Sequence, residues 1–211
     1  MMPFDFKKEY KNLYAPKTAP TIVDVPEMTF IMIDGEGDPN ISIAYQSAVE
    51  ILYGLSYAIK MSKKSDKQPE GYFDFVVPPL EGLWQGEVND KSGFIWTSMI
   101  RQPDFVTERV FEQAKETLAK KKPQLDLSLA RLERFAEGLC GQVMHLGTYD
   151  DEPATIAALD KFIADSGHRL DFSKQRRHHE IYLADPRKTG TGPSGALEKL
   201  KTVLRHPIRA S

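Results

Sequence analysis

The chain has a single cysteine, Cys140, among its 211 residues. This scarcity excludes an internal disulfide framework and any metal site that needs several thiolates from one chain. No apolar run approaches the roughly 18 residues that a bilayer-spanning helix needs, which argues against a membrane protein. The first residues are charged and aromatic and lack the apolar stretch of a signal peptide, so we expect a cytoplasmic protein.

An excess of positive charge is missing as well. The chain carries 28 Lys and Arg against 30 Asp and Glu, a formal net charge of −2, so we expect no general attraction to nucleic acid. The hydrophobic share of 41% is typical of a soluble globular protein and too high for a disordered one. The length suits one substantial domain or two small ones with a shared core.

Several familiar catalytic motifs are also absent. The glycine-rich stretch near Gly35 lacks the continuations of a phosphate-binding loop, and no HExxH or GxSxG pattern occurs. The adjacent His178 and His179 are of a type that binds metals. Neighbouring strand residues point to opposite faces, however, and cannot readily bind the same ion. We therefore expect neither a metal nor a cofactor.

The hydrophobic periodicity predicts a mixed α+β protein in which the order β-α-β-β occurs twice. The predicted elements are a strand at residues 28–34, a helix at 42–62, strands at 72–77 and 93–101, a connecting helix at 104–121, a strand at 139–149, a helix at 150–166, and strands at 178–184 and 202–208. The segment up to Pro26 is expected to be an extended arm, held to the body by its aromatic side chains.

Short sequence echoes favour an internal duplication. Residues 99–103 (MIRQP) close the first half as residues 203–207 (VLRHP) close the second. Two such units related by a pseudo-twofold axis can join into one antiparallel sheet, with helices on one face and a ligand cleft on the other. Within a single domain spanning 1–211, we assign the first repeat to 27–103, the connecting helix and linker to 104–126, and the second repeat to 127–208.

The segment RRHHEIYL at residues 176–183 carries the best candidate for the polar centre of a site. In a strand His178, Glu180 and Tyr182 share one face, while Ile181 lies on the other. Ile181 suits the face beneath the helices, so we expect Glu180 to point into the cleft. There it would neutralise a ligand cation or act as an acid or base.

A less specific interpretation of Glu180 stays open. It would then be an edge-strand glutamate, paired with Arg176 or Arg177 in solvent.

Aromatic side chains provide further candidates for the cleft wall, because flat rings suit planar ligands and stabilise cations. Tyr149 follows a predicted strand where the helix begins, and His145 shares a face of that strand with it. Trp84 and Trp96 are the only two tryptophans of the chain. An ordinary place in the core is the alternative interpretation of Tyr149, and a single tryptophan is more often part of a core than of a ligand wall.

Four segments together give the chain a family resemblance: IDGEGDPN (33–40), PLEGLW (79–84), EGLCGQVMHLGTYDDEP (137–153) and HHEIYLADPR (178–187). The chain resembles a stand-alone GyrI-like small-molecule-binding domain without a DNA-binding domain. The resemblance implies a duplicated β-α-β-β (SHS2-like) fold and a cleft carboxylate at Glu180. One departure is Gly141, where a β-branched residue is expected.

The resemblance leaves two functions open. In related multidrug-responsive regulators such a glutamate meets lipophilic cations among aromatic rings, which implies binding of planar, amphipathic molecules for sequestration or detoxification. Some stand-alone members are similar to hydrolases that open strained cyclopropane rings of DNA-alkylating natural products. Glu180 would then be the general base, with Tyr149 as a second catalytic residue. A protein partner such as gyrase has no specific support in the sequence.

Overall fold

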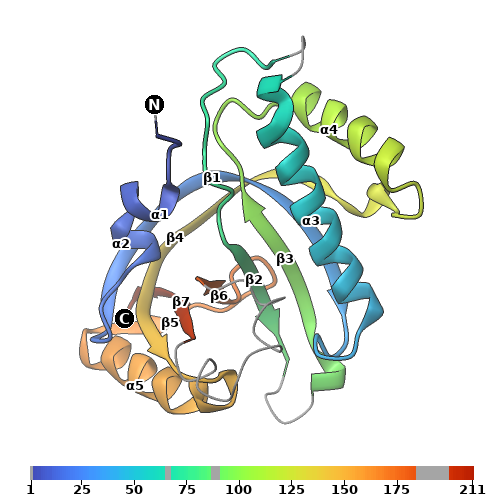
Figure 1. Cartoon of the computed structure of the whole chain (residues 1–211). Helices are drawn as coiled ribbons and strands as arrows, with labels where there is room; N and C mark the ends of the chain where they lie inside the picture. Colours follow the sequence, from blue (N-terminus) through green and yellow to red (C-terminus); the bar gives the residue numbers. More distant parts are fainter. Residues whose placement is uncertain (1, 65–67, 87–90, 184–199) are drawn as a thin grey trace. The chain divides into compact units, whose positions relative to one another are not determined.

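The computed structural model describes residues 2–64, 68–86, 91–183 and 200–211, and it has the predicted mixed α+β class (Figure 1). The helices are α1 (Phe6–Glu9), α2 (Lys11–Tyr14), α3 (Ile43–Met61), α4 (Glu108–Lys121) and α5 (Glu152–Asp165). The strands are β1 (Thr21–Glu36), β2 (Leu80–Gln85), β3 (Ile95–Arg101), β4 (Arg131–Leu146), β5 (His168–Leu170), β6 (His178–Tyr182) and β7 (Lys201–Ala210). None of the helices in the described ranges is long and apolar enough to cross a membrane.

The element order follows the expected β-α-β-β pattern in each half. The first half runs β1-α3-β2-β3 and the second β4-α5-β6-β7, with the short β5 added after α5. Ala184, the last residue of the strand predicted at 178–184, lies outside the described residues. The pseudo-twofold relation between the halves stays a prediction.

The chain forms two compact units, each assembled from segments far apart in the sequence. Unit 1 comprises Met1–Glu9, Met28–Pro78 and Gln85–Phe135, and unit 2 comprises Tyr10–Glu27, Pro79–Trp84 and Ala136–Ser211. All side chains around Glu180 that are described below belong to unit 2.

In unit 1 the strands β1 and β3 pair antiparallel, and α4 packs against α3 (Figure 1). Helix α3 begins where the Ser42 hydroxyl accepts a hydrogen bond of 3.2 Å from the backbone N–H of Tyr45, which satisfies one donor of the first turn. Gly54 permits the close approach of the two helices, since a Cβ there would lie 2.8 Å from Leu118 Cδ2.

The prediction of a strand at residues 72–77 is wrong. Phe75 makes only an isolated bridge to Phe4, and the strand of this region is β2, which begins at Leu80. The alternating aromatic residues that suggested a strand form a ring cluster instead. Its edge-to-face pairs are Phe4 with Phe73, Phe73 with Phe75, Phe73 with Phe105, and Phe75 with Phe105.

Two further boundaries differ from expectation. The N-terminal segment is not extended to Pro26, because α1 and α2 form first and β1 already begins at Thr21. Strand β4 begins at Arg131 and is therefore longer than predicted. Gly138 adopts a φ of +72° within β4, and this left-handed residue interrupts the alternation by which a strand is recognised.

In unit 2 the strand β7 pairs with β4, β6 and β5, and β6 also pairs with β2, all antiparallel. Helix α5 covers one face of β4 and β7. The buried core between them consists of Val143, Leu159, Ile163, Leu204 and Ile208. Gly167, with a φ of +74°, follows the end of α5 and lets the chain turn back.

Gly141 accounts for the close packing of α5 on β4. A Cβ at this position would lie 2.7 Å from both Cγ1 and Cδ1 of Ile163 and 3.3 Å from Leu159 Cδ1. The β-branched residue expected here would force Ile163 to move. We predict that Gly141→Val destabilises the chain by about 1–3 kcal/mol through overpacking, measured by urea unfolding. Adding Ile163→Ala should recover part of that loss in a double-mutant cycle, and strictly additive effects would contradict the packing argument.

Candidate functional site

Glu180 lies on a central strand rather than at a sheet edge. It stands opposite Gly82 of β2 on one side and Leu204 of β7 on the other. Arg176 does not pair with it, because that guanidinium binds the Asp171 carboxylate and donates to the carbonyl of Leu139 at 2.8 Å. The edge-strand interpretation, with Arg176 as the partner, is therefore wrong.

The face assignment of β6 needs one correction. Directly opposed residues of an antiparallel pair share a face, so Glu180 lies on the same face as Leu204, which packs on α5. Ile181 and His179 lie on the other face, which α2 and its neighbours cover instead of a long helix. The expectation that Ile181 would sit beneath the helices is wrong, although the predicted alternation along β6 is correct.

Both oxygens of Glu180 are hydrogen-bonded to the two residues predicted to share its face. His178 Nε2 lies 3.0 Å from Oε1, and the Tyr182 hydroxyl donates to Oε2 at 2.6 Å. The Tyr182 oxygen in turn accepts the indole N–H of Trp84 at 3.0 Å. The Glu180 side chain is only 15% exposed, so these donors replace most of its hydration.

The position of Trp84 depends on a glycine two residues earlier. Side chains two apart in a strand share a face, and the Trp84 indole leans back along β2 over Gly82. A Cβ at Gly82 would lie 2.6 Å from the indole Nε1. Since Gly82 stands opposite Glu180, its missing side chain leaves room for the ring beside the carboxylate.

Tyr149 completes an aromatic group next to Glu180. It lies in the short 3-10 helix Tyr149–Asp151, and its ring meets the Tyr182 ring edge-on at 5.8 Å between centroids. Burial and the nearby charges of Glu180 and Glu152 raise the pKa of Tyr149 to about 12, so the phenol keeps its proton at neutral pH. The Tyr149 side chain is nevertheless partly open to solvent, where a ligand can reach it.

The other two sequence candidates lie in different surroundings. Trp96 belongs to unit 1, where its buried ring packs edge-on against Tyr45 at 5.1 Å. His145 is buried and both of its ring nitrogens are engaged, with Thr155 Oγ1 and the carbonyl of Thr148, each at 2.9 Å. His145 therefore ties the end of β4 to α5 and makes no recorded contact with Glu180 among the described residues.

Two site-lining residues were missed from the sequence. His206 Nε2 lies 2.8 Å from Nδ1 of His178, and His206 Nδ1 lies 2.6 Å from the Asp160 carboxylate on α5. Asp160 follows Leu159 and lies at the edge of the apolar stripe of α5. This position was the sign in the sequence that its carboxylate is partly buried. Within the described ranges, no group of three or more His, Cys, Asp or Glu has the arrangement of a metal site.

The opposite face of the same strands carries a buried charge cluster. His179 Nδ1 lies 3.0 Å from Glu137 Oε1, and its Nε2 lies 3.1 Å from Glu81 Oε2. Arg205 Nη1 lies 3.1 Å from Glu137 Oε2 and its Nε donates to the Gln142 side chain at 3.1 Å. The two cations balance the two carboxylates, which makes such deep burial of charge tolerable. Glu81 is thus a buried structural residue.

The N-terminal segment closes this charge cluster. The Tyr14 hydroxyl donates to Glu81 Oε1 at 3.2 Å, and the Arg205 guanidinium donates to the carbonyl of Leu13. Burial alone would lower the pKa of His179, but Glu137 and Glu81 raise it to about 9. Burial alone would raise the pKa of Glu137, but His179 and Arg205 lower it to about 2.

These shifts predict how stability depends on pH. The pKa of His179 rises from 6.5 to about 9 on folding, so its contribution is complete below pH 6.5 and is lost as pH rises through 9. The loss amounts to roughly 3 kcal/mol. The Glu137 contribution is complete above pH 4.5 and is lost as pH falls through 2. We expect urea unfolding to give the greatest free energy of unfolding between about pH 4.5 and pH 6.5, where both contributions are complete.

A variant pair tests the assignment to His179. His179→Gln should flatten the decline of stability between pH 6.5 and 9. The control variant is His168→Gln, at a half-buried histidine whose Nδ1 lies 2.9 Å from the carbonyl oxygen of Ser166. An equal decline in wild type and His179→Gln would contradict the assignment.

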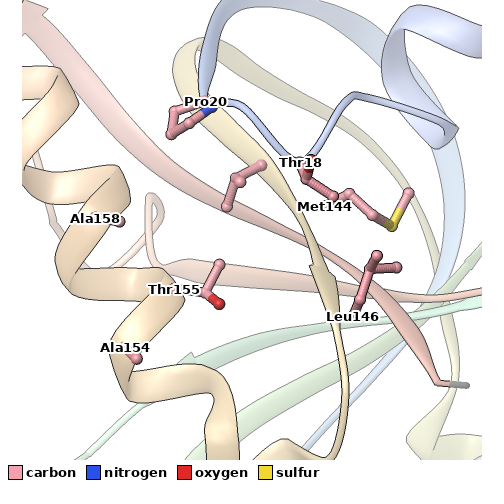
Figure 2. Close-up of a pocket in the computed structure, with 8 residues that line it drawn as sticks. Thr18, Pro20, Met144, Leu146, Ala154, Thr155 and Ala158 are labelled. Carbon is pink, nitrogen blue, oxygen red and sulfur yellow. The ribbon is translucent and has the colours of Figure 1, made fainter. Parts of the chain in front are cut away.

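A pocket of about 330 Å³ lies elsewhere in unit 2, between α5, β4 and residues 18–20 (Figure 2). It is lined by Thr18, Pro20, Val143, Met144, Leu146, Ala154, Thr155 and Ala158. It contains no charged side chain, and Thr155 is already bonded to His145. Because a specific small-molecule site needs convergent polar groups, the Glu180 group is the better candidate site.

The fold and the site together define a mixed α+β protein in which a hydrogen-bonded carboxylate, imidazoles and aromatic rings lie on one face of the sheet. The family model of the GyrI-like small molecule binding domain matches residues 18–195. The chain therefore belongs to the GyrI-like family of small-molecule-binding domains.

Solved structures agree with this membership. A hydrolase from Listeria innocua is 50% identical, with 98% of this chain and 100% of that chain covered and a TM-score of 0.89. An uncharacterized conserved protein from Listeria innocua is also 50% identical, with the same coverage and a TM-score of 0.90. The EcmrR C-terminal domain is 10% identical, covers 91% of this chain and 98% of its own, and at a TM-score of 0.53 shares the fold alone. None of the curated proteins matches this chain.

Proposed function

We propose that the chain binds a small organic molecule beside Glu180 and hydrolyses it, with Glu180 as the general base. The observation that carries this proposal is that both Glu180 oxygens are held by hydrogen bonds, from His178 and Tyr182. A carboxylate that only neutralised a ligand cation would need no such fixed orientation. A base must point at the proton that it removes, and geometry of this kind supports that role.

The reaction that suits this site is the opening of a strained ring by water. Glu180 takes a proton as the water oxygen forms a bond to a ring carbon. The strained carbon–carbon bond breaks, and its electron pair takes up a proton, so that one water is consumed. Because ring strain supplies most of the driving force, one positioned base contributing about 10²–10⁴-fold is sufficient.

The aromatic rings beside Glu180 are suited to position the substrate. Trp84, Tyr149 and Tyr182 present flat rings and polar tips around the carboxylate, which suits a planar, amphipathic molecule. The raised pKa of Tyr149 keeps its hydroxyl protonated, so it is able to donate a hydrogen bond to a substrate oxygen. The full-length similarity to a Listeria hydrolase supports the general reaction type. A cytoplasmic role in detoxifying DNA-alkylating electrophiles would follow.

The same aromatic group favours a second candidate function, which is binding without turnover. Rings around an anionic centre stabilise lipophilic cations, and a carrier of such compounds would protect by sequestration. Both functions require a ligand at Glu180, and they differ in whether the compound returns unchanged.

Incubation of the wild-type protein with activated cyclopropane electrophiles, with product detection by mass spectrometry, tests the proposal. Hydrolysis predicts a product heavier by one water, at a rate that exceeds the uncatalysed reaction. A parallel equilibrium titration with a cationic dye measures binding. Tight binding of the electrophiles with quantitative return of unchanged compound would overturn the hydrolase proposal in favour of sequestration.

A further inference from the structure

A row of four polar side chains leads from Glu180 to the surface of α5. Glu180 Oε1 lies 3.0 Å from His178 Nε2, His178 Nδ1 lies 2.8 Å from His206 Nε2, and His206 Nδ1 lies 2.6 Å from Asp160 Oδ1. At these lengths each contact is a hydrogen bond that holds one proton between its two atoms. The row therefore needs three protons in its three contacts.

Two neutral imidazoles and two ionised carboxylates supply fewer than these three protons. A neutral imidazole carries one N–H, so the two rings provide two, and an ionised carboxylate at either end only accepts. Three satisfied contacts therefore require one proton beyond the two of neutral rings. The side chains of His178 and His206 are 19% and 5% exposed, so water has little access to replace a missing contact.

The additional proton has four possible positions, and every contact stays satisfied in each. On Glu180 it makes that residue an acid, on either ring it makes an imidazolium, and on Asp160 it makes a carboxylic acid. Burial lowers the pKa of His206 and the neighbouring His178 lowers it further, while Asp160 opposes both effects. Burial is the largest of these effects and the pKa of His206 is lowered overall, so the additional proton is not trapped as a cation on that ring.

We propose that His178, His206 and Asp160 form a proton relay that serves Glu180 and stores this additional proton. The proposal rests on the proposed hydrolysis. When Glu180 takes a proton from the attacking water, Asp160 releases the stored proton to solvent, and the protons within the row only shift across their own hydrogen bonds. The electron pair of the broken bond takes up a proton from solvent, so the balance is one water consumed.

The surroundings of the row fit this direction of transfer. The Asp160 side chain is 35% exposed, against 15% for Glu180, so protons exchange with water at the helix end of the row. The Phe172 ring packs edge-on against His206 at 5.0 Å between centroids and shields it. Among the described residues, the carboxylates hydrogen-bonded to the two rings are Glu180 from β6 and Asp160 from α5. The three relay residues act through Glu180 and are positioning residues, not catalytic ones.

Nuclear magnetic resonance of the protein with ¹⁵N-labelled histidine and ¹³C-labelled carboxyl groups tests the stored proton without any substrate. We expect the two rings and the Glu180 and Asp160 carboxyl groups together to hold three protons at neutral pH and to lose one in a single coupled step at higher pH. Asp160→Asn should move that step down by about one pH unit or more, because the anion that favours the cation is gone. Two neutral rings at neutral pH, together with ionised carboxylates at both Glu180 and Asp160, would overturn the proposal.

Turnover measurements then test the relay itself. Asp160→Asn should lower kcat roughly tenfold or more, leave KM unchanged and shift the pH profile of kcat. Asp165→Asn is the matched control, since Asp165 lies on the same helix, is exposed and pairs with the exposed Lys161 at 2.7 Å. Equal kinetics for the two variants would overturn the relay. A wild type that turns over no electrophile would instead remove the proposed function, and the resonance titration would still decide whether the row stores a proton.

Discussion

Glu180→Gln is expected to lower the turnover of an activated cyclopropane by about 10²–10⁴-fold, the contribution of a positioned general base. Glutamine keeps the size of the side chain and one acceptor oxygen, so the hydrogen bonds from His178 and Tyr182 are only partly lost. It has no lone pair basic enough to take a proton from water. The loss should therefore fall on kcat, while KM stays within a few-fold of the wild-type value.

The control for this experiment is Glu36→Gln, which removes an equal charge from an exposed position of β1 and should leave turnover unchanged. Dye binding gives a second readout. Weakened binding of a cationic dye to Glu180→Gln, together with unchanged binding of a neutral analogue, would show that the carboxylate also neutralises ligand charge. Unchanged turnover in Glu180→Gln would exclude this residue as the base.

Glu137→Ala is expected to lower the free energy of unfolding by about 3–5 kcal/mol, the cost of breaking a buried ion pair from one side. Glu137 contacts both His179 and Arg205 through its two oxygens. Its removal leaves two buried cations facing only the Glu81 carboxylate. The Arg205 guanidinium also binds the backbone of Leu13, so the N-terminal segment should become easier to cleave by protease.

Glu133→Ala provides a matched comparison from the same strand. Glu133 pairs with Arg131 at 2.6 Å, but both side chains are more than one-third exposed, and exposed pairs contribute about 0–1 kcal/mol. Urea unfolding, followed by circular dichroism, compares the two variants. Similar losses for Glu133→Ala and Glu137→Ala would contradict the assignment of Glu137 as a residue that stabilises the folded chain.

The alternation of a strand was sufficient to predict the core of the candidate site. It placed His178, Glu180 and Tyr182 on one face and His179 on the other, and the hydrogen bonds of each face agree with this division. It did not reveal which face α5 covers. That depends on the pairing of β6 with β7, and no local pattern in the strand records the identity of its neighbour.

His206 and Asp160 were missed because their contact also depends on which elements pack against each other. His206 and Asp160 meet across 46 residues of sequence, and neither belongs to a motif that marks such a contact. Strand β2 was missed because Gly82 interrupts its apolar run, whereas the aromatic residues before it imitate a strand. A glycine that makes room for a site also weakens the hydrophobic pattern by which its strand is recognised.

The two adjacent histidines of β6 also set the alignment of that strand during folding. A shift of β6 by one residue would exchange its two faces. Glu180 would then enter the space between Glu81 and Glu137 in place of an imidazolium, and three carboxylates would face a single guanidinium. Electrostatic repulsion would disfavour the misaligned sheet, so the order His-His-Glu helps to fix the register of β6.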